Sequence, residues 1–120
     1  MAKILIADDS DAIRLVLKDI LQIGEHEIVG EAIDGAEAVE LFNSLNPDIL
    51  LLDLAMPKKD GLTVLNEIIP HNPKAKVILI TASDDQKIIS SCMNAGAMSY
   101  ISKPFDFNKV LQSINDVLGK

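Results

Sequence analysis

The sequence predicts a single α/β domain in which helices cover both faces of a five-stranded parallel sheet. Short apolar runs rich in Ile, Leu and Val alternate along the chain with segments whose apolar residues recur at helical spacing. The runs are apolar at successive positions, which is typical of strands buried on both faces. Strands that alternate with helices in this way form right-handed βαβ units and a parallel sheet.

Five of the apolar runs are predicted strands. They are KILIAD (3–8), HEIVGEAI (26–33), DILLLD (48–53), KVILITA (76–82) and MSYISKP (98–104). For five parallel strands joined by helices we expect the doubly wound, flavodoxin-like order 2-1-3-4-5.

Five helices are expected between and after the strands. Four are defined by apolar faces, made by Ile13, Val16, Leu17, Ile20 and Leu21; by Ala38, Leu41, Phe42 and Leu45; by Leu62, Leu65 and Ile69; and by Phe107, Val110, Leu111, Ile114, Val117 and Leu118. The fourth helix in chain order is expected from Asp84 to Ala95, with Asp84 or Ser83 as its N-cap. Gly119 occupies a position where glycine commonly ends a helix.

Length and composition indicate one domain, residues 1–120, without a separate output domain. The chain is 48% hydrophobic and carries a net charge of −7, and an acidic protein repels nucleic acid. No apolar run approaches the roughly 20 residues of a membrane-spanning helix, and the N-terminus does not read as a signal peptide. The single cysteine, Cys92, excludes an internal disulfide. We therefore expect a cytoplasmic protein, and a monomer.

Polar residues end four of the predicted strands, and the fold brings these ends together. The first strand is followed by Asp8 and Asp9, the third ends at Asp53, the fourth reaches Thr81 and the fifth reaches Lys103. Ligands of doubly wound sheets bind beyond the carboxyl ends of the strands, where the strand order reverses. Three neighbouring carboxylates need a counter-charge. The Lys103 ammonium and a magnesium ion, which prefers oxygen ligands, would supply it.

Each of these residues also has a purely structural interpretation. Asp8 and Asp9 could belong to a solvated turn or cap a helix, Thr81 could simply favour a strand, and Lys103 could be solvated. Their convergence favours a functional site, because clustered titratable groups are typical of such sites. A carboxylate beside a metal ion and a cation can act as a nucleophile toward phosphorus, and Asp53 is the candidate for that role.

The motifs ILIADDS, DILLLDLAMPKKDG, VILITAS and GAMSYISKPF resemble those of the receiver domains of two-component response regulators. The resemblance covers the chain from Lys3 to the last helix, and it implies a protein that is not a turnover enzyme. It implies that Asp53 accepts a phosphoryl group from a histidine kinase. It also implies that Asp8, Asp9, Asp53 and the backbone carbonyl of Ala55 bind Mg²⁺.

The same resemblance assigns roles to residues of the last two predicted strands. Thr81 matches the hydroxyl residue that moves to bind the phosphoryl group, and Lys103 matches the lysine that pairs with it. The Lys103–Pro104 peptide bond is cis in the family. Tyr100 matches an aromatic switch residue, although a half-buried strand residue is its alternative interpretation.

The resemblance implies an output surface formed by the fourth helix, the fifth strand and the fifth helix. Phosphorylation would change this surface, so that it binds a downstream partner such as a flagellar switch or an adaptor protein, with a phosphatase as a further partner. GEAIDGAEAVELF and the short C-terminal end favour the stand-alone chemotaxis type. The alternatives are a phosphorelay intermediate that passes its phosphoryl group to a histidine phosphotransfer protein, and a phosphate-independent adaptor. A flavin-binding module is disfavoured by the few aromatic residues.

Two positions depart from the pattern of fast chemotaxis receivers. Ala55 stands where these carry Asn, and Ser83 stands where Glu is frequent. Both positions influence the water that attacks the aspartyl-phosphate. We therefore expect slow self-dephosphorylation, or dependence on a partner phosphatase.

Overall fold

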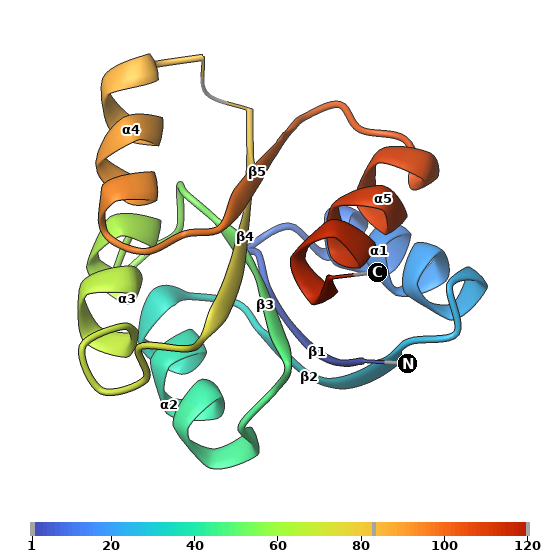
Figure 1. The fold of residues 1–120 in the computed structure, drawn as a ribbon, viewed down its shortest axis with the longest axis horizontal. Coiled ribbons are helices and arrows are strands. Elements are labelled where there is room, and N and C mark those ends of the chain that lie inside the picture. Colours follow the sequence, from blue (N-terminus) through green and yellow to red (C-terminus); the bar gives the residue numbers. More distant parts are fainter. Residues whose placement is uncertain (1, 83, 120) are drawn as a thin grey trace.

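The structure is a computed structural model that describes residues 2–82 and 84–119. All strand pairs of its sheet are parallel, and the strand order β2-β1-β3-β4-β5 confirms the predicted topology (Figure 1). The strands are β1 (Lys3–Ala7), β2 (Glu27–Ala32), β3 (Ile49–Asp53), β4 (Lys76–Thr81) and β5 (Ser99–Ser102). The helices are α1 (Asp11–Ile23), α2 (Gly35–Leu45), α3 (Gly61–Ile68), α4 (Gln86–Asn94) and α5 (Phe107–Leu118).

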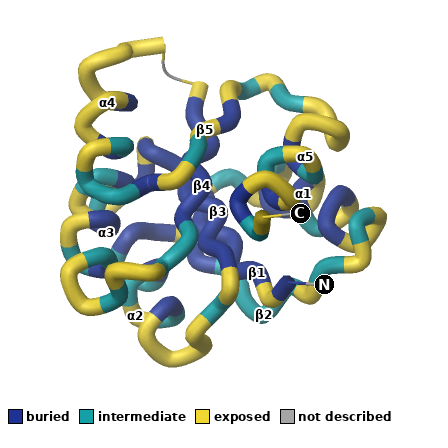
Figure 2. Tube along the Cα trace, in the orientation of Figure 1, coloured by how far each residue is buried: buried dark blue, intermediate teal, exposed yellow. Residues whose placement is uncertain are grey.

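The sheet separates two hydrophobic cores. Successive side chains of a strand point to opposite faces, so Leu50 and Leu52 of β3 pack with α2, α3 and α4, whereas Ile49 and Leu51 pack with α1 and α5. Figure 1 shows α2, α3 and α4 on one side of the sheet and α1 and α5 on the other. All five residues of β3 are buried, and Figure 2 shows the same for the centre of the sheet. The site residues on β1 and β3 are therefore carried by fully packed strands.

Aspartate or serine side chains cap the starts of the helices. Ser10 caps α1, and Asp34, Asp60 and Asp106 cap α2, α3 and α5, each accepting a hydrogen bond from a backbone N–H three residues later. These bonds satisfy N–H groups that have no partner inside the helix. At the other end of α5, Gly119 has a φ of 79°, which confirms the predicted glycine cap.

The predicted bounds of the fourth helix were wrong at both ends. The helix begins at Gln86 and ends at Asn94, and its N-cap is Asp85, which accepts hydrogen bonds from the N–H groups of Lys87 and Ile88. Asp84, the predicted cap, precedes this position. The two adjacent aspartates are equivalent in sequence, and only the path of the chain into the helix distinguishes them. Ser83, the other predicted cap, lies outside the described residues.

Three apolar positions assigned to helix faces are exposed. Val16 of α1, Leu45 of α2 and Phe107 of α5 are 45%, 37% and 48% exposed. In α1 the position nearer the core belongs to Arg14, which is only 8% exposed. Periodicity does not predict a buried arginine. Within the described residues, no helix is both long enough and apolar enough to cross a bilayer.

Candidate functional site

Three carboxylates meet at the carboxyl ends of β1 and β3. Asp8 and Asp53 are buried and Asp9 is exposed, and one oxygen of each lies within 4.8 Å of the others. The parallel pairing of β1 with β3 sets this proximity, because Ala7 lies opposite Leu52 and the next residue of each strand is an aspartate. Carboxylate oxygens are the ligands that Mg²⁺ prefers, so the donor set fits that ion.

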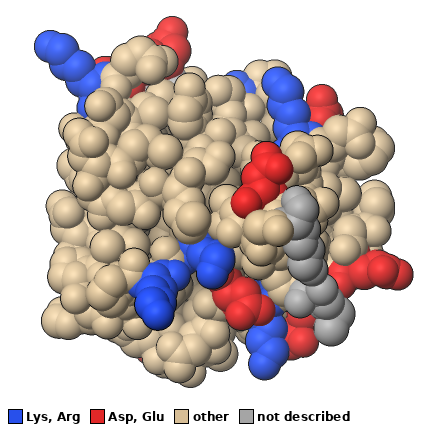
Figure 3. Space-filling model, viewed as in Figure 1, with Lys and Arg blue, Asp and Glu red and all other residues tan. Residues whose placement is uncertain are grey.

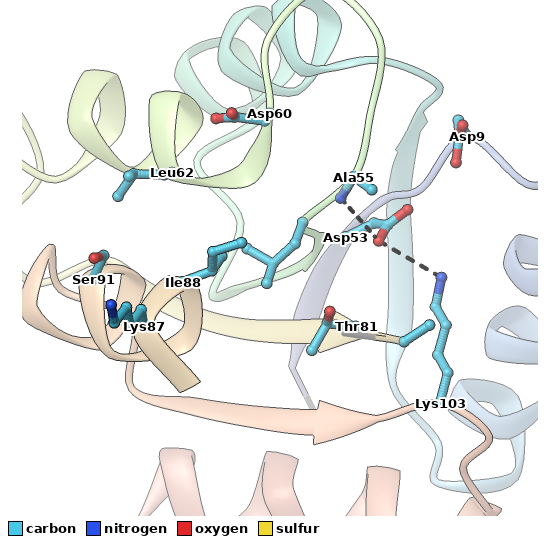
Figure 4. A pocket seen from close by; sticks show the side chains of 12 residues that line it. Asp9, Asp53, Ala55, Asp60, Leu62, Thr81, Lys87, Ile88, Ser91 and Lys103 are labelled. Atoms are coloured by element: carbon cyan, nitrogen blue, oxygen red, sulfur yellow. Dashed lines mark hydrogen bonds and ion pairs between the residues drawn. The ribbon is translucent and has the colours of Figure 1, made fainter. Parts of the chain in front are cut away.

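Lys103, which follows the edge strand β5, brings a positive charge to the carboxylates. Its Nζ atom lies 3.1 Å from Oδ2 of Asp8 and 3.6 Å from Oδ1 of Asp53. Its backbone N–H donates to the Thr81 carbonyl at 2.7 Å, which fixes it at the end of β5. The Lys103–Pro104 peptide bond is cis, as the resemblance implies. Figure 4 shows the Lys103 side chain extended toward Asp53.

The environment of Asp53 disfavours its charged form. Burial, with repulsion from Asp8 as a smaller cause, raises the pKa of Asp53 from 3.8 to about 6, and the attraction of Lys103 only partly opposes this. One ammonium group therefore does not fully compensate the acidic cluster. A divalent cation would complete the neutralisation, and this electrostatic deficit is a second feature that fits Mg²⁺.

The loop after β3 carries Ala55 and is anchored at several points. Within it, the Ala55 N–H donates to Oδ1 of Asp53 at 3.3 Å, and the Gly61 N–H donates to the Leu54 carbonyl at 2.9 Å. From the start of α2, the Gly35 N–H donates to the Pro57 carbonyl at 3.3 Å. A Cβ atom on Gly35 would lie 1.9 Å from the carbonyl oxygen of Lys59, so only glycine allows this approach.

An ion pair adds to the anchoring of this loop. Nζ of Lys58 lies 3.4 Å from Oδ2 of Asp34, and Lys58 has the left-handed φ of 68°. The hydrogen bond from the Glu37 N–H, with a smaller effect of Lys58, lowers the pKa of Asp34. Asp34 thus caps α2 and holds the loop after β3 at the same time.

A cavity of about 770 Å³ extends from the acidic cluster toward α4. Asp53, Thr81 and Lys103 line it at the sheet, and Leu62 of α3 and Ile88 of α4 line it farther out. Figure 4 shows these side chains around the opening. This volume lies within the range of small-molecule sites, and Asp53 lies on the wall of the cavity.

The structure brings most of the predicted site residues together, but not Tyr100. Thr81 is 2% exposed at the end of β4 and lines the cavity with Asp53. Tyr100 lies on β5, is 42% exposed and lines a different, shallower hollow with residues of α5. An exposure of 42% on β5 is compatible with the alternative interpretation of Tyr100 as a half-buried strand residue. The roles assigned to all these residues stay predictions.

The sequence reading missed two residues near the site. Arg14 and Glu31 form an ion pair of 3.1 Å beneath the acidic residues, and Arg14 also donates to the backbone carbonyl of Asp8. The signal that could have indicated Arg14 is its helical spacing from Leu17 and Leu21, which places it on the buried face of α1. Glu31 had no signal, because its partner is on another element.

The fold and the acidic site agree with a comparison against known families. The model of the response regulator receiver domain matches residues 4–115, and the chain belongs to this family. Receiver domains are parts of two-component systems, in which they serve phosphorylation-dependent signalling and are not turnover enzymes. They use Mg²⁺ at their acidic pocket and interact with histidine kinases and downstream effectors.

Individual relatives cover almost the whole chain. Chemotaxis protein CheY of Thermotoga maritima is 38% identical over 115 residues, which are 96% of this chain and 96% of that protein. Protein CcdB of Bacillus subtilis is 39% identical over 119 residues, 99% of each chain. The structure of a CheX–CheY–BeF3–Mg²⁺ complex from Borrelia burgdorferi matches with a TM-score of 0.94 and 38% identity, covering 98% of this chain and 90% of the other.

Proposed function

We propose that this chain is a signalling switch in which Asp53 accepts a phosphoryl group from a histidine kinase in a Mg²⁺-dependent reaction. The observation that carries the proposal is the position of Asp53, which is buried between Asp8 and Lys103 and opens into the cavity. The 38% identical structure from Borrelia burgdorferi is that of a CheX–CheY–BeF3–Mg²⁺ complex, which supports the same chemistry for this chain.

Each residue has a distinct part in the proposed reaction. An oxygen of Asp53 attacks phosphorus, the bond from phosphorus to the kinase histidine breaks, and its electron pair returns to the imidazole nitrogen. Lys103 neutralises charge on the phosphoryl oxygens, and the Thr81 hydroxyl binds one of them after the transfer. Mg²⁺ held by Asp8, Asp9, Asp53 and the Ala55 carbonyl would supply further positive charge to the transferring group.

The output of the switch is a change in the surface formed by α4, β5 and α5. Ile88, Tyr100 and Phe107 of these elements are 45%, 42% and 48% exposed. Figure 3 shows that much of this side of the molecule is uncharged, with charged side chains at scattered points. Movement of Thr81 toward the phosphoryl group and of Tyr100 into the protein would shift a two-state equilibrium of the surface.

The proposed role is that of a stand-alone cytoplasmic receiver of the chemotaxis type, monomeric and without nucleic acid as a partner. Relatives named chemotaxis protein CheY favour this role over that of a phosphorelay intermediate. The downstream partner would be a flagellar switch or an adaptor protein, and a phosphatase would end the signal.

The test is intact-mass spectrometry after incubation with acetyl phosphate. Wild type and Asp53→Asn are compared with and without Mg²⁺. We expect a phosphoryl adduct on the wild type in Mg²⁺ only, and none on Asp53→Asn. A wild type without an adduct under any condition would favour the phosphate-independent adaptor. Transfer of the adduct to a histidine phosphotransfer protein would favour the phosphorelay intermediate.

A further inference from the structure

The guanidinium group of Arg14 contacts the backbone of the acidic pair, Asp8 and Asp9, and two other segments of the chain. Its Nη1 donates to the backbone carbonyl of Asp8 at 2.7 Å, and its Nε donates to Oε1 of Glu31 at 3.1 Å. Its Nη2 contacts the carboxylate of Asp11 in the first turn of α1. The Arg14 side chain is only 10% exposed. One buried cation thus joins the end of β1, the strand β2 and the start of α1.

The turn that carries the acidic pair is fixed mainly through its backbone. The Asp8 N–H donates to the Ala32 carbonyl at 3.1 Å, and the Ser10 N–H donates back to Oδ1 of Asp8 at 2.9 Å. Asp9 differs from Asp8, because its carboxylate accepts no hydrogen bond from the residues that the structure describes. The position of the Asp9 side chain therefore depends on the peptide between Asp8 and Asp9.

Arg14 holds the carbonyl oxygen of that peptide. A charged donor to a buried carbonyl makes a stronger hydrogen bond than a neutral donor, and the planar guanidinium can bind Glu31 at the same time. Without the guanidinium, the buried Asp8 carbonyl would lose its hydrogen-bond donor. Rotation of the peptide toward solvent would let water donate to this carbonyl instead. The same rotation would turn the Asp9 carboxylate away from Asp53.

We propose that Arg14 is a positioning residue for the acidic pair. Its hydrogen bond to the Asp8 carbonyl orients the Asp8–Asp9 peptide, so that both carboxylates face Asp53 and bind a divalent cation together. The inference rests on the proposed function in one respect, namely that the acidic pair binds Mg²⁺. Groups that orient metal ligands from behind have large effects on metal affinity, which makes the proposal measurable.

The test is calorimetric titration of the purified protein with MgCl₂, without a phosphoryl donor. The variants are Arg14→Met, which removes the hydrogen bonds, and Arg14→Lys, which keeps the positive charge but lacks the planar guanidinium group with its several donors. Lys18→Met is the matched control, because Lys18 binds Oε2 of the same Glu31 at 3.1 Å but does not contact Asp8. Ile114→Val, on the buried face of α5, controls for a general loss of stability.

We expect Arg14→Met to weaken Mg²⁺ binding by about tenfold or more, and Arg14→Lys by a smaller factor. Lys18→Met and Ile114→Val should keep the wild-type affinity. A cooperative unfolding transition in EDTA identifies the variants that are folded. If Arg14→Met does not fold, the Mg²⁺ affinity of Arg14→Lys alone tests the proposal. Wild-type affinity in the folded Arg14 variants would overturn this proposal only. A wild type that binds no Mg²⁺ would overturn it together with the Mg²⁺-dependent function.

Discussion

The Nζ atom of Lys103 lies 3.6 Å from Oδ1 of Asp53, a longer ion pair than Lys103 makes with the neighbouring carboxylate. Burial of Asp53 and repulsion from Asp8 raise its pKa to about 6, and the attraction of Lys103 only partly opposes this shift. The same imbalance that favours a bound cation makes the acidic cluster costly for folding when no cation neutralises it. Proteins often accept such costs at functional sites.

Asp53→Asn should stabilise the metal-free protein at neutral pH. The native pKa of Asp53 lies above the unfolded value of 3.8, so its contribution to stability is full below that value and is lost as the pH rises through about 6. We expect Asn to raise the free energy of unfolding by about 2 kcal/mol at pH 7.5, with little effect near pH 3.5. Urea unfolding in EDTA at both pH values measures this.

Asp19→Asn is the control for that experiment, because Asp19 is exposed on α1, away from the cluster. It should change stability little at either pH. Added Mg²⁺ should then stabilise the wild type more than Asp53→Asn, because only the wild type keeps the full set of carboxylates. An Asp53→Asn variant less stable than the wild type at pH 7.5 would contradict the prediction.

Ala55→Asn should shorten the lifetime of the phosphoryl adduct. Ala55 lines the cavity with a methyl group, which cannot orient water. An amide at this position can hydrogen-bond to the water molecule that attacks the aspartyl-phosphate. One such bond of about 1 kcal/mol in the transition state corresponds to about fivefold faster decay. The measurement is the loss of adduct mass with time in Mg²⁺ after the donor is removed. Thr63→Asn adds an amide at an exposed position of α3 and should leave the decay rate unchanged. Equal decay rates in the wild type and both variants would refute the role of Ala55.

Tyr100 can report the switch by itself. The chain contains one tyrosine and no tryptophan, so its tyrosine emission arises from Tyr100 alone. Inward rotation should reduce quenching of this emission by acrylamide when Asp53 is phosphorylated, because the ring is 42% exposed beforehand. Thr81→Ala should still form the adduct but show a smaller change. An identical change in Thr81→Ala would show that Tyr100 moves independently of Thr81.

Gly35→Ala should disturb the site from the first turn of α2. The added methyl group would meet the Lys59 carbonyl, and relief of this contact must displace the loop that carries Ala55. We expect a loss of about 2 kcal/mol in the free energy of unfolding, together with weaker Mg²⁺ binding. Gly119→Ala adds a methyl group in open space at a φ of 79° and should cost about 1 kcal/mol without affecting Mg²⁺. Equal effects of both variants on Mg²⁺ binding would refute the coupling.

The sheet could be predicted from the sequence because its apolar runs are long and unambiguous. β3 shows this most clearly: its residues from Ile49 to Leu52 are all apolar, and the structure buries every one of them. Helix ends were harder to predict. Asp84 and Asp85 have the same capping chemistry, and the choice between them depends on the path of the chain after β4, which composition does not encode.

The candidate site was predictable where its residues follow strands. Asp8, Asp53 and Lys103 each stand at or just beyond a strand end, so strand order alone places them together. Arg14 and the Asp34–Lys58 ion pair were not predictable, because their partners lie on other elements. A charged residue in a helical pattern is expected to face solvent, and only the folded chain shows that Arg14 does not.

The separation between the packed strands that hold Asp8 and Asp53 and the exposed side chains of α4, β5 and α5 has an evolutionary consequence. After gene duplication, a few substitutions at positions such as Ile88, Tyr100 or Phe107 would give a copy a new binding preference while the acidic cluster stayed unchanged. Both copies would still react alike with a phosphoryl donor. Protection against cross-talk between such paralogues would then have to come from their surfaces, since their interiors would not discriminate.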